Sequence, residues 1–154
     1  MATKELRSRS RSHYGYFSEY KLRWSDNDQY GHMNNVVPFH LFDSVINAYL
    51  IEYCGRDPTS SDQIGLVVSS RCDFFSPIAF PAVVDLGLRV STLGRSSASY
   101  EVGIFERGSD QTCAVGGYTH VFVDRHTKKP TEKGMSDEIR RGLSRILSQP
   151  SARL

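Results

Sequence analysis

The chain has 154 residues, of which 39% are hydrophobic and 23% charged, a composition typical of one globular domain and not of a disordered, collagen-like or coiled-coil protein. Lys and Arg number 19 against 17 Asp and Glu, so charge alone gives no argument for nucleic-acid binding. No apolar run approaches the roughly 18 residues that a membrane-spanning helix needs.

The first residues are rich in arginine and serine, and the apolar stretch of a secretory signal does not follow them. We expect 1–14 to form a disordered tail and 15–150 to form a single folded domain. We expect the protein in the cytoplasm, and the Arg/Ser-rich start leaves a mitochondrial location open. The three cysteines lack a CxxC pair, so we expect free thiols, and the sequence indicates no metal site.

The first half of the chain predicts a strand, a polar loop and a long helix. Residues 16–24 are rich in aromatic side chains and favour a strand, and 26–35 form a polar loop that contains glycine. From Val37 onward, apolar residues recur every four positions for about five turns, which is typical of a helix with one broad apolar face. Gly55 and Pro58 end the pattern.

In the second half the apolar period changes from about four to two, which predicts antiparallel strands. We expect four further strands and a short C-terminal helix, over residues 64–75, 84–90, 99–106, 112–124 and 136–148. The fold class is therefore α+β, with a five-stranded antiparallel sheet wrapped around the long helix. One helix covers only one face of such a sheet, so we expect a second copy to bury part of the rest, in a homodimer at least.

The most informative stretch runs from Trp24 to Asn35 and reads WSDNDQYGHMNN. It places two carboxylates, a histidine and two terminal amides directly before the start of a helix. The first N–H groups of a helix have no acceptor within it and can hold an oxyanion. A carboxylate nearby can attack a carbonyl carbon or activate a water molecule. The pattern therefore indicates chemistry on a carbonyl group.

The motif Asp-x-Asp-x-x-Gly-His-x-Asn-Asn before an apolar helix resembles the hotdog-fold acyl-CoA thioesterases, and among them the 4-hydroxybenzoyl-CoA thioesterase-like family. LGRSS at 93–97 and HVFVD at 120–124 resemble later parts of the family pattern, so the likeness covers about residues 16–148. It implies a hotdog fold, a homodimer or homotetramer, and hydrolysis of a thioester in lipid or aromatic acyl metabolism. It implies no cofactor except the coenzyme A of the substrate.

The resemblance assigns the catalytic carboxylate to Asp28, as nucleophile or general base, and the oxyanion hole to the backbone N–H groups of Asn35 and Val36. Asp26 and His32 are expected to order the loop rather than to react. Arginine suits the phosphates of CoA, with serine hydroxyl or N–H groups as further donors. The substrate-binding positions that we expect are Tyr30, Gly31, His32, Asn34, Arg71, Phe74, Arg95, Ser96 and Ser97.

Pro38 departs from the family pattern, which has an aromatic residue at this position. Because proline lacks an N–H and fits only the first helical turn, it moves the expected N-cap to 35–37. Two other functions stay open: a hotdog dehydratase or hydratase that pairs His32 with Asp28, and a non-catalytic thioester-binding protein, which Pro38 favours. An acyl carrier protein also stays open in place of CoA.

Overall fold

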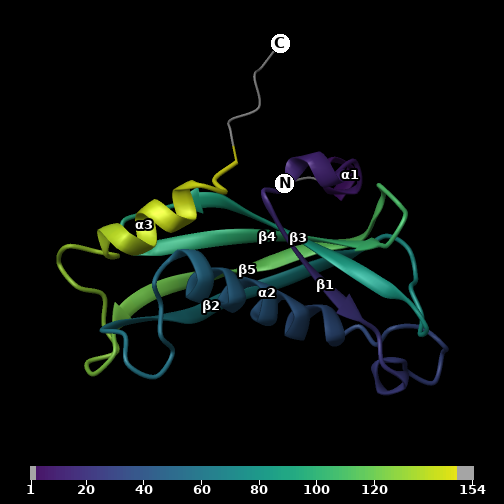
Figure 1. Cartoon of the computed structure of the whole chain (residues 1–154), viewed down its shortest axis with the longest axis horizontal. Coiled ribbons are helices and arrows are strands. Elements are labelled where there is room, and N and C mark those ends of the chain that lie inside the picture. The colour runs from purple at the N-terminus through teal and green to yellow at the C-terminus, as the bar shows by residue number, and fades with distance from the viewer. Residues whose placement is uncertain (1–2, 149–154) are drawn as a thin grey trace, which may run out of the picture.

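The computed structural model describes residues 3–148, in which one long helix lies along one face of a five-stranded antiparallel sheet (Figure 1). The strand order is β1-β3-β4-β5-β2, so β1 and β2 form the two edges. The strands are β1 Tyr16–Lys21, β2 Gln63–Phe74, β3 Val83–Leu93, β4 Ser97–Glu106 and β5 Thr112–Asp124. Within 3–148, no helix is long and apolar enough to cross a membrane.

The helices of the described residues are α1 Thr3–Arg7, α2 Val37–Tyr53 and α3 Asp137–Ser144, with short 3₁₀ turns at Arg11–His13 and Trp24–Asp26. The N-cap of α2 is Val36, and Pro38 lies in the first turn, which confirms the effect predicted for the proline. Gly55, with a φ of +61°, follows the last turn.

The predicted strands and helices are confirmed, with bounds that shift by a few residues. The first strand ends at Lys21 instead of residue 24 because Trp24 enters a 3₁₀ turn. The C-terminal helix is shorter than the predicted 136–148 and ends at Ser144. Residues 149 and 150 of the expected domain lie outside the described residues.

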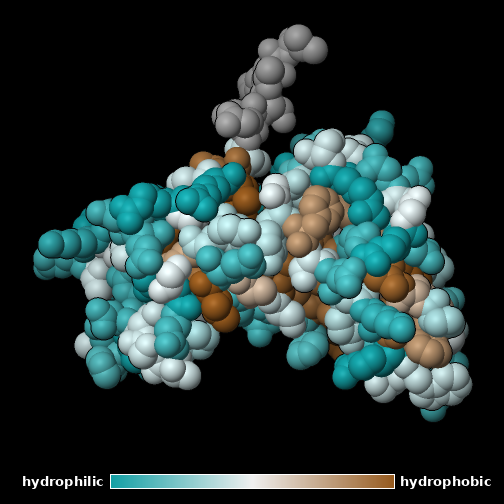
Figure 2. Space-filling view, in the orientation of Figure 1, coloured by the Kyte–Doolittle hydropathy of each residue, from teal (hydrophilic) through white to brown (hydrophobic). Residues whose placement is uncertain are grey.

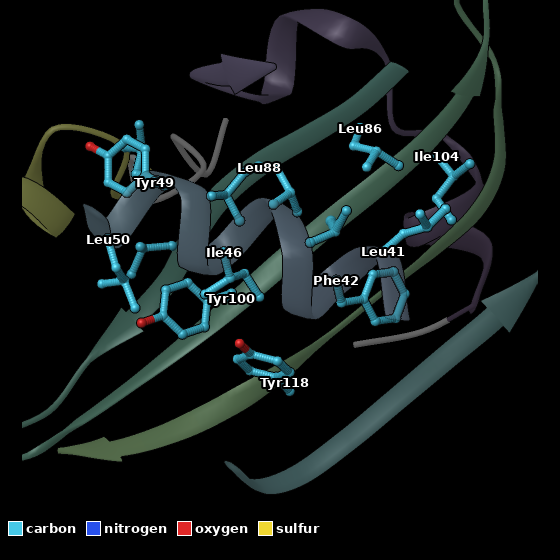
Figure 3. Packing of buried hydrophobic residues seen from close by; sticks show 14 of the residues in the cluster. Leu41, Phe42, Ile46, Tyr49, Leu50, Leu86, Leu88, Tyr100, Ile104 and Tyr118 are labelled. Carbon is cyan, nitrogen blue, oxygen red and sulfur yellow. The ribbon is translucent and has the colours of Figure 1, made fainter. Parts of the chain in front are cut away.

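The main core lies between α2 and the inner face of the sheet. Figure 3 shows side chains of the helix packed against the strands beneath them. The labelled residues are Leu41, Phe42, Ile46, Tyr49 and Leu50 from α2, Leu86 and Leu88 from β3, Tyr100 and Ile104 from β4, and Tyr118 from β5. A sheet that curves around one long helix in this strand order is the hotdog fold.

The N-terminal segment covers part of the outer face of the sheet, on the side away from α2. The ring of Tyr14 lies over Gly87 and Gly103, where a Cβ atom would come within 2.8 Å and 2.7 Å of it. Because neighbours along a strand point to opposite faces, these glycines face away from the side that packs on α2. Leu6 is buried, and Arg9 forms an ion pair with Glu101 of β4. The prediction of a disordered tail is therefore wrong for residues 3–14.

The surface that remains includes a long, open strand edge. β2 pairs only with β5, and Val67 and Val68 on it are 48% and 61% exposed. Figure 2 shows that apolar residues also reach the surface in separate patches on the face seen in Figure 1. The three cysteines are free thiols. Burial raises the pKa of Cys54 and Cys72 to about 12, so neither is activated as a thiolate.

Candidate active site

The loop before α2 is closed on itself around Asp28. The Asp28 N–H donates to the His32 carbonyl across 2.8 Å, and the Gly31 N–H donates back to the Asp28 carbonyl across 3.2 Å. Gly31 has a φ of +82°, which residues with a Cβ atom rarely adopt. These bonds hold Asp28 in one place at the end of the sheet.

The Asp28 carboxylate is half-buried, and only one of its oxygens is engaged. Oδ1 accepts the Tyr30 N–H across 2.8 Å, whereas Oδ2 accepts no hydrogen bond from any residue between 3 and 148. The first bond orients the carboxylate, and the second oxygen is left able to meet a substrate or a water molecule.

Asp26, the other carboxylate of the motif, has a structural environment. It is buried, and it accepts hydrogen bonds from the Tyr20 hydroxyl, the Arg23 N–H and the Arg23 guanidinium. Burial by itself would raise the pKa of Asp26, but the hydrogen bonds from Arg23 and Tyr20 outweigh it and lower the pKa below the usual value. This carboxylate orders the loop, as predicted.

The segment 34–38, where the loop enters α2, has one backbone N–H group without an acceptor among the described residues. The Asn34 N–H donates to the Asp26 carbonyl, the Val36 N–H to Asn34 Oδ1 across 3.1 Å, and the Val37 N–H to the Asn34 carbonyl across 2.9 Å. Pro38 has no N–H. Within 34–38, the Asn35 N–H alone has no partner among the described residues. The Val36 N–H, expected in the oxyanion hole, is therefore already occupied, and its acceptor is the Asn34 side chain.

The same loop forms one wall of a cavity of about 290 Å³. The Met33 N–H donates to the Ile78 carbonyl across 2.7 Å, and the Phe80 N–H donates to Asn27 Oδ1 across 3.0 Å, so the loop is bonded to the chain that forms the opposite wall. The lining residues are His32, Met33, Asn35, Phe74, Phe75, Ser76, Pro77, Ile78, Cys113 and Ala114.

Several predicted substrate-binding residues lie at this cavity or beside it. His32 and Phe74 line it, and Asn34 and Gly31 belong to the loop that closes it. Tyr30 follows Asp28 in the same loop but is 87% exposed and lines no part of the cavity. Among residues 3–148, no group of three or more His, Cys, Asp or Glu side chains is placed to hold a metal ion.

Arg71 does not lie on the side of the sheet that carries the cavity. Phe74 and Cys72 on β2 face the cavity and the core under α2. Because side chains alternate along a strand, Arg71 faces the opposite side, where it lines a separate pocket of about 260 Å³ with Ser99 and Thr119. The expectation that Arg71 contacts the substrate is not met within one chain.

Arg95, Ser96 and Ser97 are at the far end of the sheet from Asp28. The loop with Asp28 follows β1, whose last residue pairs with Val83 at the start of β3. The turn with Arg95 follows the end of β3, and the 11 residues of this strand span about 33 Å. One chain therefore does not bring this turn to the loop.

Most of the apolar cavity wall could not be predicted from the sequence. Met33, Ile78, Cys113 and Ala114 come from three separate segments, and nothing in their local patterns distinguishes them from ordinary core residues. The segment that contains Ile78 connects β2 to β3, and the peptide bond between Phe80 and Pro81 in it is cis. Proline at 77 and 81 was the only signal that this connection is irregular.

Comparison with solved structures finds close relatives of this arrangement. The PA5185 protein from Pseudomonas aeruginosa strain PAO1 is 44% identical, with a TM-score of 0.87, over 92% of this chain and 97% of that one. The PA2801 protein from Pseudomonas aeruginosa, a proposed thioesterase, is 27% identical, with a TM-score of 0.74, over 81% and 95%. Slr0204, a 1,4-dihydroxy-2-naphthoyl-CoA thioesterase from Synechocystis, is 14% identical, with a TM-score of 0.74, over 84% and 95%, which shows a shared fold alone.

Comparison with protein families gives a match that begins two residues after Asp28. The sequence model of the thioesterase superfamily matches residues 30–113, which is more than half of the chain. The matched part begins in the loop, contains all of α2 and ends at the cavity wall. With the hotdog architecture and the site at the start of α2, this match shows that the chain belongs to the thioesterase superfamily.

Proposed function

We propose that this protein hydrolyses acyl-CoA thioesters to a free acid and coenzyme A. The observation that carries the proposal is the presence of two incompletely bonded groups in one loop. One is Asp28, whose Oδ2 has no partner among residues 3–148, and the other is the Asn35 N–H, the single backbone N–H of 34–38 without a partner among the same residues. A carboxylate and an oxyanion donor are the two groups that thioester hydrolysis needs.

In the proposed reaction, the thioester carbonyl oxygen accepts the Asn35 N–H, which lies at the positive end of the α2 dipole. Asp28 then attacks the carbonyl carbon, the C–S bond breaks, and the thiolate takes a proton from water. Water hydrolyses the resulting anhydride and restores the carboxylate. In the alternative, Asp28 takes a proton from a water molecule that attacks the carbonyl carbon directly. Both routes end with one acid and one thiol and need no further cofactor.

We propose in addition that the working unit contains two copies joined along β2. Antiparallel pairing of two β2 strands about a twofold axis would place the Gln63 end of one copy beside the Phe74 end of the other. The Gln63 end lies next to the turn with Arg95, because Ser136 and Gly134 bond to Gln63 and the neighbouring Met135 bonds to the Arg95 carbonyl. The pairing would bring the second copy's cationic turn to the mouth of the cavity, where CoA phosphates need it, and not into the lining that the acyl group meets.

Product analysis tests the proposal against its two alternatives. We expect incubation with a panel of acyl-CoAs to release free thiol and free acid in equal amounts. Crotonyl-CoA reports on the hydratase alternative, because hydration of its double bond consumes the enoyl absorbance without releasing thiol. Hydration without thiol release would show that the protein is a hydratase and not a thioesterase. Thioester binding with neither reaction would identify a non-catalytic binding protein. The same assay with the acyl group attached to acyl carrier protein instead of CoA shows which of the two carriers the enzyme uses.

A further inference from the structure

The cavity beside the loop is lined mostly by apolar residues. Seven of its ten lining residues are apolar or contain only sulfur as a heteroatom: Met33, Phe74, Phe75, Pro77, Ile78, Cys113 and Ala114. The other three, His32, Asn35 and Ser76, include the residue with the unpaired N–H. A thioester whose carbonyl oxygen meets that N–H would therefore have an apolar cavity beside its carbonyl carbon.

The cavity has fixed walls, because backbone hydrogen bonds connect them. The Phe75 and Ser76 N–H groups both donate to the Cys113 carbonyl, across 2.8 Å and 3.1 Å. The Met33 N–H joins the loop to the Ile78 carbonyl across 2.7 Å. The segments that line the cavity are therefore bonded to one another, and their separation sets what the cavity accepts.

The size of the cavity limits the group that it accepts. An apolar cavity of about 150 Å³ in another protein holds one benzene molecule, and pockets for drug-sized ligands begin at about 300 Å³. With about 290 Å³, this cavity has room for one aromatic ring with its linking carbons or for an aliphatic chain of medium length. A long, fully extended fatty acyl chain would extend far beyond it.

The chemistry of the lining limits the charge of that group. Among residues 3–148, no Asp, Glu, Lys or Arg side chain lines the cavity. A second carboxylate on the acyl group would lose its hydration there without gaining a cationic partner, which is costly. Neutral acyl groups bear no such cost.

We infer that this cavity receives the acyl group and makes the enzyme selective for compact, neutral, apolar acyl groups, over long-chain and dicarboxylic ones. The inference rests on the proposed thioesterase function. Ala114 is the main specificity-determining residue, because it is 2% exposed, lines the cavity on β5 and pairs across the sheet with Phe74. A larger side chain at 114 would occupy the space that the acyl group needs.

The experiment measures kcat/KM for acetyl-, hexanoyl-, benzoyl-, palmitoyl- and succinyl-CoA with the full-length protein. We expect hexanoyl- or benzoyl-CoA to be preferred over palmitoyl-CoA by at least about tenfold, and over succinyl-CoA by about a hundredfold. Ala114→Leu should lower the ratio of hexanoyl-CoA to acetyl-CoA by about tenfold or more. Ala48→Leu, a matched change on α2 at a residue that does not line the cavity, should leave this ratio unchanged.

A second variant protects the test against misfolding of the first. Ser76 is exposed at the cavity rim, so Ser76→Phe can narrow the entrance without repacking the core, and it should lower the same ratio. Hydrolysis with equal kcat/KM for palmitoyl- or succinyl-CoA would overturn this inference while leaving the thioesterase function intact. An unchanged ratio in both variants would do the same. Failure to hydrolyse any thioester would overturn the proposed function, and the inference with it.

Discussion

Arg9 and Glu101 are 92 positions apart in the sequence, yet they form a buried ion pair with 3.0 Å between Nε and Oε2. Arg89 from β3 approaches the same carboxylate at 3.2 Å, and the Tyr14 hydroxyl donates to it across 2.9 Å. Glu101 thus has partners from its own sheet and from the N-terminal segment, and this shared carboxylate holds the segment to the outer face.

Replacement of Arg9 should therefore destabilise the fold. Arg9→Ala leaves Glu101 with one cationic partner in a site where it is 4% exposed, so we expect a loss of about 3 kcal/mol in the free energy of unfolding. Arg107 offers a control, because it forms an exposed ion pair with Glu19. Arg107→Ala should lower the free energy of unfolding by at most about 1 kcal/mol. Equal losses in urea unfolding for the two variants would contradict this account.

The oxyanion donor can be tested with one variant that removes the Asn35 N–H and a second variant that removes only the side chain. Asn35→Pro removes the N–H, whereas Asn35→Ala keeps it and removes only the side chain. We expect the proline variant to lower kcat by about 10²–10³, the usual effect of losing one oxyanion donor. The alanine variant should stay close to the wild type. If both variants lose activity equally, the Asn35 side chain is responsible and the backbone is not.

Pairing through β2 predicts that a charge on this edge separates the two copies. Val68 is 61% exposed at the bulge of β2, so Val68→Lys changes the edge without disturbing the core. We expect light scattering after gel filtration to show a dimer for the wild type and a monomer of low activity for this variant. Leu147→Lys, at an exposed apolar residue away from β2, is the control and should remain dimeric. A dimeric Val68→Lys would place the interface elsewhere.

His120 predicts a loss of stability in acid. It is 2% exposed, and burial lowers its pKa to about 4, although the Asp43 charge opposes this shift. Between about pH 6.5 and 4 the unfolded chain therefore binds a proton that the folded chain does not, so stability is full above this range and falls as the pH decreases through it. The total loss from this group is about 3 kcal/mol or less. In urea unfolding, His120→Phe should show a flatter pH dependence over the same range.

The helices and strands could be predicted from the sequence, but the contacts between distant parts of the chain could not. Alternation at 84–90 predicted β3, and Pro38 predicted where α2 begins, because both effects are local. The prediction of a disordered N-terminal tail rested on its Arg/Ser composition, which gives no sign that Arg9 forms an ion pair with Glu101. The turn with Arg95 was assigned to the site from the family pattern, which does not reveal that the length of β3 separates it from Asp28 within one chain.

The measurement that tests the account most directly compares Asp28→Asn with the wild type, using kcat for hydrolysis and calorimetric binding of CoA. The substitution keeps the shape of the side chain and its acceptor for the Tyr30 N–H, while it removes the charge. We predict that kcat falls by about 10²–10⁴ while the affinity for CoA and the melting temperature stay the same. A variant that keeps kcat within about tenfold of the wild type would contradict the assignment of Asp28 as the catalytic carboxylate.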